Sequence, residues 1–146
     1  MASILKVDTI TGVATAGSIA ITGEGNSTTT NLQQGLIKSW VNLNGTSTIA
    51  TRDSFNVGSL TDNGTGDYSI NFSNNMSNGN YSITSGVNNY EGASDNRFFM
   101  FIKGAGSHDW STIATGSYRT ISTDVDNGLN AIDSSLVSKS VQGDLA

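Results

Sequence analysis

The later part of the chain alternates between hydrophobic and polar residues with a period of two. The clearest run holds Tyr68, Ile70 and Phe72, which alternate with Ser69 and Asn71. Successive side chains of a β-strand point to opposite faces of the sheet, so this run predicts a strand with one buried face.

Similar patterns predict further strands at 40–44, 55–60, 81–83, 118–123 and 136–141. Turn-forming residues separate them, most clearly at 62–67 and 74–79. Short strands at roughly ten-residue spacing are typical of sandwiches and barrels. The sequence therefore predicts an all-β fold, an antiparallel β-sandwich or a jelly-roll-like domain.

The segment 98–102 is hydrophobic at every position, Phe98-Phe99-Met100-Phe101-Ile102. A strand that is apolar on both faces is expected to lie in the centre of a sheet or under a partner. The flanking residues Arg97 and Lys103 resemble the charges that guard aggregation-prone strands.

One short helix is predicted over 31–40. Thr30 and Gln33 fit a capping box, with Thr30 as the N-cap. Leu32, Leu36 and Trp40 then follow at intervals of four, on one helical face. So short a helix must pack on something, either the β core or equivalent helices at a three-fold axis. These three residues are the candidate oligomer contacts.

The first 30 residues are expected to be extended. The strand-and-turn signal Ile10-Thr11-Gly12 recurs as Ile21-Thr22-Gly23, with too few apolar residues nearby for a separate core. We therefore predict an N-terminal attachment or oligomerisation segment at 1–35, which includes the start of the helix, and a β-sandwich domain at 36–146.

The composition adds a reason for oligomerisation. Charged residues make up 13% of the 146 residues and hydrophobic residues 36%, with 17 glycines and no proline. Disordered chains combine low hydrophobicity with high charge, so the low charge favours an ordered protein. A modest core favours burial of further apolar area between subunits, so we expect a homo-oligomer.

Several function classes do not fit. The net charge is -5 and no basic stripe is present, which argues against nucleic-acid binding. No apolar run reaches the roughly 20 residues of a membrane helix, and the N-terminus lacks a signal-peptide core. Without cysteine there are no disulfides and no thiolate metal sites.

Catalysis has little support in the sequence. The one histidine, His108, lies in a loop without a recognisable triad. Only two glutamates, Glu24 and Glu91, are available beside turn-type aspartates for the carboxylate pair of a glycosidase. We expect no enzyme and no cofactor, and a small glycan-degrading enzyme is the least favoured alternative.

Two oxygen-rich loops could hold calcium, but we expect no metal site. They contain Asp62, Asn63 and Asp67, and Asp124, Asp126 and Asn127. Neither loop has EF-hand spacing, and these residue types are ordinary turn formers.

Loop aromatics are the candidate receptor contacts. Tyr90, His108 and Trp110 lie in the predicted loops 86–96 and 104–112, next to asparagines and aspartates that could bind sugar hydroxyls. Trp110 could instead plug the end of the sandwich.

Several short motifs along the chain form one recognisable set. They are Ile4-Leu5-Lys6-Val7-Asp8-Thr9-Ile10, Asn31-Leu32-Gln33-Gln34-Gly35-Leu36, Trp40-Val41-Asn42, Asn44-Gly45-Thr46, Asp53-Ser54-Phe55-Asn56-Val57, the run from Thr61 to Tyr68, and the closing Gly143-Asp144-Leu145. In these motifs the chain resembles tail-fibre-like and virion structural proteins of marine bacteriophages. The resemblance is strongest over 1–85 and weaker over 86–142.

This resemblance implies a trimeric, β-rich appendage of the virion and no catalytic residues. Other virion proteins would bind the N-terminal segment, and a host surface glycan or protein would bind the distal loops. Fibre proteins are usually longer, so a tip, an adaptor or a capsid decoration is the alternative.

Overall fold

The computed structural model describes residues 4–12, 19–23, 28–87, 98–104, 112–124 and 128–146. The chain divides into two units, residues 1–36 and residues 37–146. The first holds a small hairpin and one helical turn, and the second holds the β-sandwich. Each is described by itself below.

The N-terminal unit contains three short elements. Strands β1 (Ala20–Thr22) and β2 (Thr29–Asn31) form an antiparallel hairpin, and α1 (Leu32–Gly35) follows directly. The second Ile-Thr-Gly copy thus contributes to a strand, whereas the first, at 10–12, forms no strand.

The helix is shorter than predicted and begins one residue later. Asn31 is its N-cap, and the Asn31 side chain accepts a hydrogen bond of 3.1 Å from the Gln34 backbone nitrogen. The predicted N-cap, Thr30, belongs to β2. Gly35 favours an early end, and Leu36 is already extended, with φ -92° and ψ 145°. The predicted helical face therefore does not exist, because Trp40 lies on a strand.

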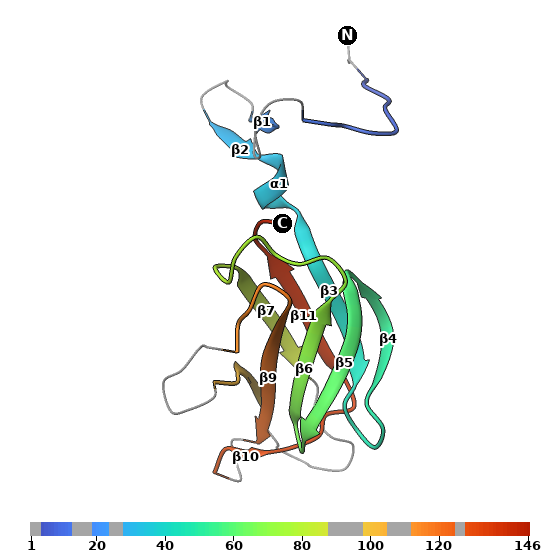
Figure 1. Ribbon diagram of the computed structural model, residues 1–146, viewed down its shortest axis with the longest axis vertical. Helices are drawn as coiled ribbons and strands as arrows, with labels where there is room; N and C mark the ends of the chain where they lie inside the picture. Colours follow the sequence, from blue (N-terminus) through green and yellow to red (C-terminus); the bar gives the residue numbers. More distant parts are fainter. Residues whose placement is uncertain (1–3, 13–18, 24–27, 88–97, 105–111, 125–127) are drawn as a thin grey trace. The chain divides into compact units, whose positions relative to one another are not determined.

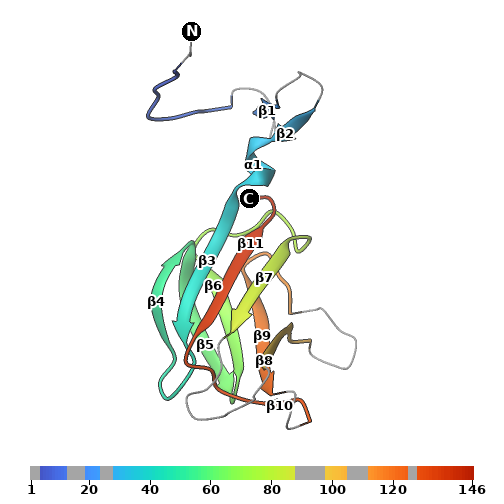
Figure 2. The ribbon, with the colours of Figure 1, turned by 180° about the vertical axis from the view of Figure 1, so that it is seen from behind.

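The second unit is an all-β sandwich of two antiparallel sheets, as the alternation predicted. Figure 1 shows β5, β6 and β9 in front, and Figure 2 shows β4, β3, β11 and β7 from the other side. One sheet has the order β4-β3-β11-β7, with β3 (Ile37–Asn44), β4 (Ala50–Phe55), β7 (Ser82–Val87) and β11 (Val137–Gln142). The other has the order β10-β9-β6-β5, with β8 also paired to β9; its strands are β5 (Val57–Gly64), β6 (Asp67–Phe72), β8 (Phe98–Ile102), β9 (Ser117–Asp124) and β10 (Asn130–Ala131).

The core lies between these sheets and follows the period-two pattern. On β6 the predicted run Tyr68, Ile70 and Phe72 is buried, and on β3 Val41 and Leu43 are buried while their neighbours are partly exposed. The core is completed by Met76, Tyr81, Tyr118, Val137 and Val141.

A single residue carries the chain from one sheet to the other. Asn56 stands between β4 and β5 and has a φ of 55°, a conformation that asparagine tolerates better than most residues. Its side chain bonds the Lys38 carbonyl at 3.0 Å and both backbone groups of Asn74, at 3.1 and 2.7 Å. The amide thus fastens the crossing to β3 and to the turn that follows β6.

The hydrophobic strand β8 is not central. Among the described residues it pairs only with β9, so it forms an edge of its sheet. Phe101 on this strand is 46% exposed. Of the two predicted places, the centre of a sheet is therefore excluded, and cover by a partner stays a prediction. Pattern alone cannot tell a strand flanked on two sides from an edge strand that a partner covers.

Candidate functional site

The interior of the sandwich contains a cluster of polar residues beside its apolar core. On β9 the inward positions Thr120 and Ser122 are fully buried. Ser122 shares a hydrogen bond of 2.8 Å with the buried Ser134 through their hydroxyl oxygens. Lys139 of the opposite sheet faces this strand and is only 2% exposed.

Lys139 links the two sheets through its amine. It lies on β11 between the buried residues Val137 and Val141, so the strand alternation directs it inward. Its Nζ donates to the Oγ1 of Thr120, at 2.7 Å, and to the Oγ of Ser85, also at 2.7 Å.

The two hydroxyls differ in their surroundings. Thr120 is fully buried, and its Oγ1 also donates to the Phe101 carbonyl at 2.8 Å. Ser85 lies on β7, which pairs only with β11 among the described strands, and the residue is exposed. The cluster therefore reaches from the core to the surface at the β7 edge.

Among the described residues no acid forms an ion pair with Lys139. The ion pair that the structure describes joins Arg119 and Asp67 instead. Burial alone lowers the pKa of Lys139 to about 7, because the ammonium form loses its hydration without gaining a carboxylate. Near neutral pH a large share of the molecules carries an uncharged amine at this place.

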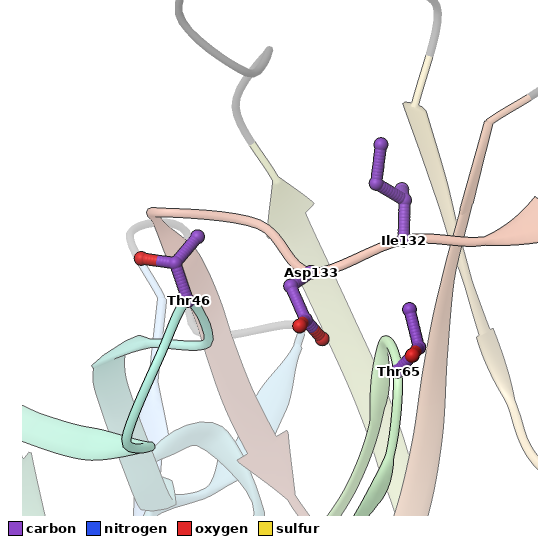
Figure 3. A pocket seen from close by; sticks show the side chains of 4 residues that line it. All are labelled: Thr46, Thr65, Ile132 and Asp133. Atoms are coloured by element: carbon purple, nitrogen blue, oxygen red, sulfur yellow. The ribbon is translucent and has the colours of Figure 1, made fainter.

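A second feature lies at the loop end of the sandwich. Thr46, Thr65, Ile132 and Asp133 line a pocket of about 370 Å³, and Figure 3 shows their side chains around it. The Asp133 carboxylate already accepts from the Gly66 nitrogen at 2.6 Å and from the Tyr68 hydroxyl at 3.1 Å.

These bonds give Asp133 a structural role. They fasten the segment before β11 to the β5–β6 hairpin, and the Tyr68 hydroxyl also reaches the Gly45 carbonyl. Among the described residues that line the pocket, Asp133 is the only acid.

The acidic turn residues are also engaged in structural contacts. Asp62 accepts from the Gly64 nitrogen at 2.9 Å, a bond that shapes the hairpin turn. Asp67 receives two bonds of 2.7 Å from the Arg119 guanidinium. Within the described ranges no group of three histidine, aspartate or glutamate side chains could hold a metal ion; Asp126 and Asn127 lie outside those ranges.

The candidate receptor contacts Tyr90, His108 and Trp110 all lie outside the described residues, as do Glu24 and Glu91. Of the candidate oligomer contacts, Leu32 and Leu36 belong to the N-terminal unit and Trp40 to β3. Trp40 is partly exposed on the outer face, where its register partners are Phe55 and Ser140.

The N-terminal unit leaves its hydrophobic side chains in solvent. Ile4 and Leu5 are 79% and 82% exposed, and α1 contains no buried residue. The other large hydrophobic side chains exposed in this unit are Val7, Ile10, Ile21 and Leu36. No helix among the described residues is long and apolar enough to cross a membrane.

The sequence analysis did not single out the Lys139 cluster. A signal was available, because Val137, Lys139 and Val141 alternate with Ser138 and Ser140. That period places the lysine on the same face as two core valines. No protein-family model, curated protein sequence or solved structure matches this chain.

Proposed function

We propose that this chain is a structural protein of a bacteriophage virion, a tail-fibre-like appendage subunit that works as a homotrimer. Residues 1–36 would attach and intertwine, and the sandwich would present a surface to the host. The proposal joins the sequence resemblance to one structural observation, the exposed hydrophobic side chains of the N-terminal unit.

That observation needs a partner to explain it. Burying apolar surface is worth about 25 cal/mol per Å², so fully exposed side chains such as Ile4 and Leu5 forgo about 2 kcal/mol each. Soluble monomers scatter such residues singly, whereas here they gather in a short unit in which no described residue is buried. Equivalent segments of two further copies could cover them around a three-fold axis.

The sandwich suits presentation of a surface. Its two sheets enclose a continuous core, and the Asn56 side chain bonds the crossing to β3 and to the turn after β6. Loops on such a frame can vary without disturbing the strands, which is how rigid scaffolds carry binding residues. Tyr90, His108 and Trp110 remain the proposed receptor contacts.

The first test is the native mass of the full chain. A homotrimer has three times the mass of the 15.2 kDa chain. Replacing Ile4, Leu5 and Ile10 together by serine should shift the protein towards monomer and leave the melting of the sandwich unchanged. The matched control replaces exposed polar residues of the same segment, Lys6→Gln and Asp8→Asn, and should keep the trimer.

A monomeric parent at micromolar concentration would contradict the trimer. A trimer that survives the triple serine replacement would move the contact away from the N-terminal unit, to the sandwich.

Position in the particle separates the appendage from its alternative, a capsid decoration protein. Gold-labelled antibody against the sandwich, viewed on intact particles, should mark the tail or its fibres. Label spread evenly over the shell would favour the decoration role and would contradict the appendage proposal.

A further inference from the structure

The contact between Lys139 and Ser85 has the arrangement of a base beside a nucleophile. A serine hydroxyl becomes a useful nucleophile when an adjacent neutral base can take its proton. The Lys139 Nζ lies 2.7 Å from the Ser85 Oγ, within the range in which a proton can be transferred.

The hydrogen-bond partners determine whether each hydroxyl acts as a donor or as an acceptor. The single hydrogen of Thr120 points to the Phe101 carbonyl, so Thr120 can only accept from the lysine. The Ser85 hydroxyl makes no other hydrogen bond with the residues that the structure describes. When the amine is neutral it keeps one lone pair, and the Ser85 hydroxyl can donate to it across the same short contact. Thr120 thus acts as a positioning residue that orients the amine.

The difference in exposure between Ser85 and Lys139 indicates which residue meets a substrate and which acts as the base. Lys139 is buried and cannot meet a substrate itself, whereas Ser85 is exposed on the edge strand β7. A reagent in solution can therefore reach the hydroxyl while the base behind it stays shielded from water.

The described neighbours of Lys139 place no charged group against its amine. Its cross-strand partners are Val41 on β3 and Ser85 on β7, and Thr120 faces it from β9. The inward titratable group nearest on β9 is Tyr118, whose pKa burial raises, so it stays neutral. Asp124 lies four residues beyond Thr120, roughly 13 Å along the strand. From β8, Met100 and Ile102 pair with the inward residues Ser122 and Thr120.

We propose that Ser85 is a nucleophile with Lys139 as its general base, and that this pair takes acyl groups from activated esters. The Ser85 Oγ bonds to the ester carbonyl carbon while its proton passes to the Lys139 Nζ. The ammonium then gives that proton to the departing alkoxide as the carbon–oxygen bond breaks. The products are an acylated Ser85 and an alcohol, and water can release the acyl group by the same proton transfers. This activity goes beyond a structural role in a virion.

The test uses a fluorophosphonate probe and p-nitrophenyl acetate on the full chain. We expect one adduct in the intact mass, and peptide mapping should place it on Ser85. Ser85→Ala should abolish it. The matched control is Ser82→Ala, which removes an exposed serine on the outer face of the same strand and should be labelled like the parent.

The pH profile separates a base from a structural lysine. Labelling of the parent should rise with pH around a midpoint near 7, where the amine loses its proton. Lys139→Met should slow labelling by about 100-fold or more, which is the usual contribution of a general base. Circular dichroism would verify that both variants remain folded.

Three results would overturn the proposal: no adduct, adducts spread over several serines, or a Ser85 adduct whose rate does not change with pH. The comparison of Ser85→Ala with Ser82→Ala remains decisive even where Lys139→Met fails to fold.

Discussion

Two neighbouring strands of one sheet, β6 and β9, are buried to the same degree and carry different chemistry. Tyr68 pairs with Thr120, and Ile70 pairs with Tyr118, so these residues share the inward face. All four are at most 1% exposed. Yet β6 offers hydrophobic and aromatic groups to the core, whereas β9 offers the hydroxyls of Thr120 and Ser122.

The difference shows that two equally buried residues can contribute very differently to the stability of the fold. The inward face of β6 gains free energy from burial, while Thr120 and Ser122 gain little and serve as hydrogen-bond partners for Lys139 and Ser134. A buried lysine without an acid costs free energy, and an apolar residue would fill its place better. We therefore expect that function, rather than stability, explains the polar residues on the inward face of β9.

The largest expected effect comes from the apolar strand. Ile70→Ala should lower the free energy of unfolding by about 4 kcal/mol, because it leaves a cavity at a fully buried site. Ile70→Val, as the control, should cost about 1 kcal/mol. Urea denaturation measures both, and a loss below about 1 kcal/mol for the alanine variant would contradict the role of β6 as the main apolar strand.

Replacing the buried lysine should change the free energy of unfolding in the opposite direction. Lys139→Met should raise the free energy of unfolding at pH 7 by about 1–4 kcal/mol, because no charge then needs to be buried. Thr120 keeps its bond to the Phe101 carbonyl in this variant, and Ser85 can bond water. A clearly destabilised variant would mean that the amine holds the sheets together.

The pH dependence of stability tests the same lysine. Between its folded pKa of about 7 and its unfolded pKa of 10.5, the unfolded chain holds one more proton than the folded chain. The stability of the parent should therefore rise from pH 7 towards pH 10, and below pH 7 this lysine should add no further change. Burial raises the pKa of Tyr81 to about 12, so ionisation of the unfolded tyrosine lowers stability above pH 10. Lys139→Met should lose the rise between pH 7 and 10, measured by denaturant melts at each pH.

Removing the ion pair between β6 and β9 should have a smaller effect on the free energy of unfolding. Asp67→Asn removes the charge that receives two 2.7 Å bonds from Arg119. The expected loss is about 1–2 kcal/mol, since the carboxylate is nearly buried while the guanidinium is about a third exposed. Asp53→Asn, at an exposed site on β4, should leave the melting temperature unchanged.

The smallest effect concerns a hydroxyl on the outer side of β9. The Thr123 Oγ1 is buried and has no hydrogen-bond partner among the described residues. Thr123→Val should therefore raise the free energy of unfolding by about 1 kcal/mol. Thr120→Val on the same strand should lower it, because the Lys139 amine loses an acceptor. Equal effects for the two variants would contradict the difference in hydrogen bonding.

The alternation of residues was enough to predict the all-β class and the buried face of β6. Side chains alternate across any strand, so Tyr68, Ile70 and Phe72 share a face whatever the strand pairs with. The chain reversal predicted within 62–67 is likewise local, and the turn itself is limited to 65–66, between β5 and β6. The Asp62 carboxylate accepts a hydrogen bond from the Gly64 nitrogen just before this turn.

Features that depend on distant partners could not be predicted in this way. Residues 37–40 of the predicted helix belong to β3 instead. Pairing of this segment with β4 and β11 outweighs its weak local preference for a helix. The place of β8 at an edge also depends on strand pairing, so the pattern could not choose between an edge strand under a partner and a central strand.

The candidate site shows most clearly what the sequence alone cannot predict. The sequence by itself places Lys139 on the inward face of its strand, between two valines. Only the tertiary structure decides that Ser85, 54 residues away, and Thr120, 19 residues away, lie within 2.7 Å of its amine. The physical reason is that alternation fixes the face of a residue, whereas strand order and the packing of two sheets fix its neighbours.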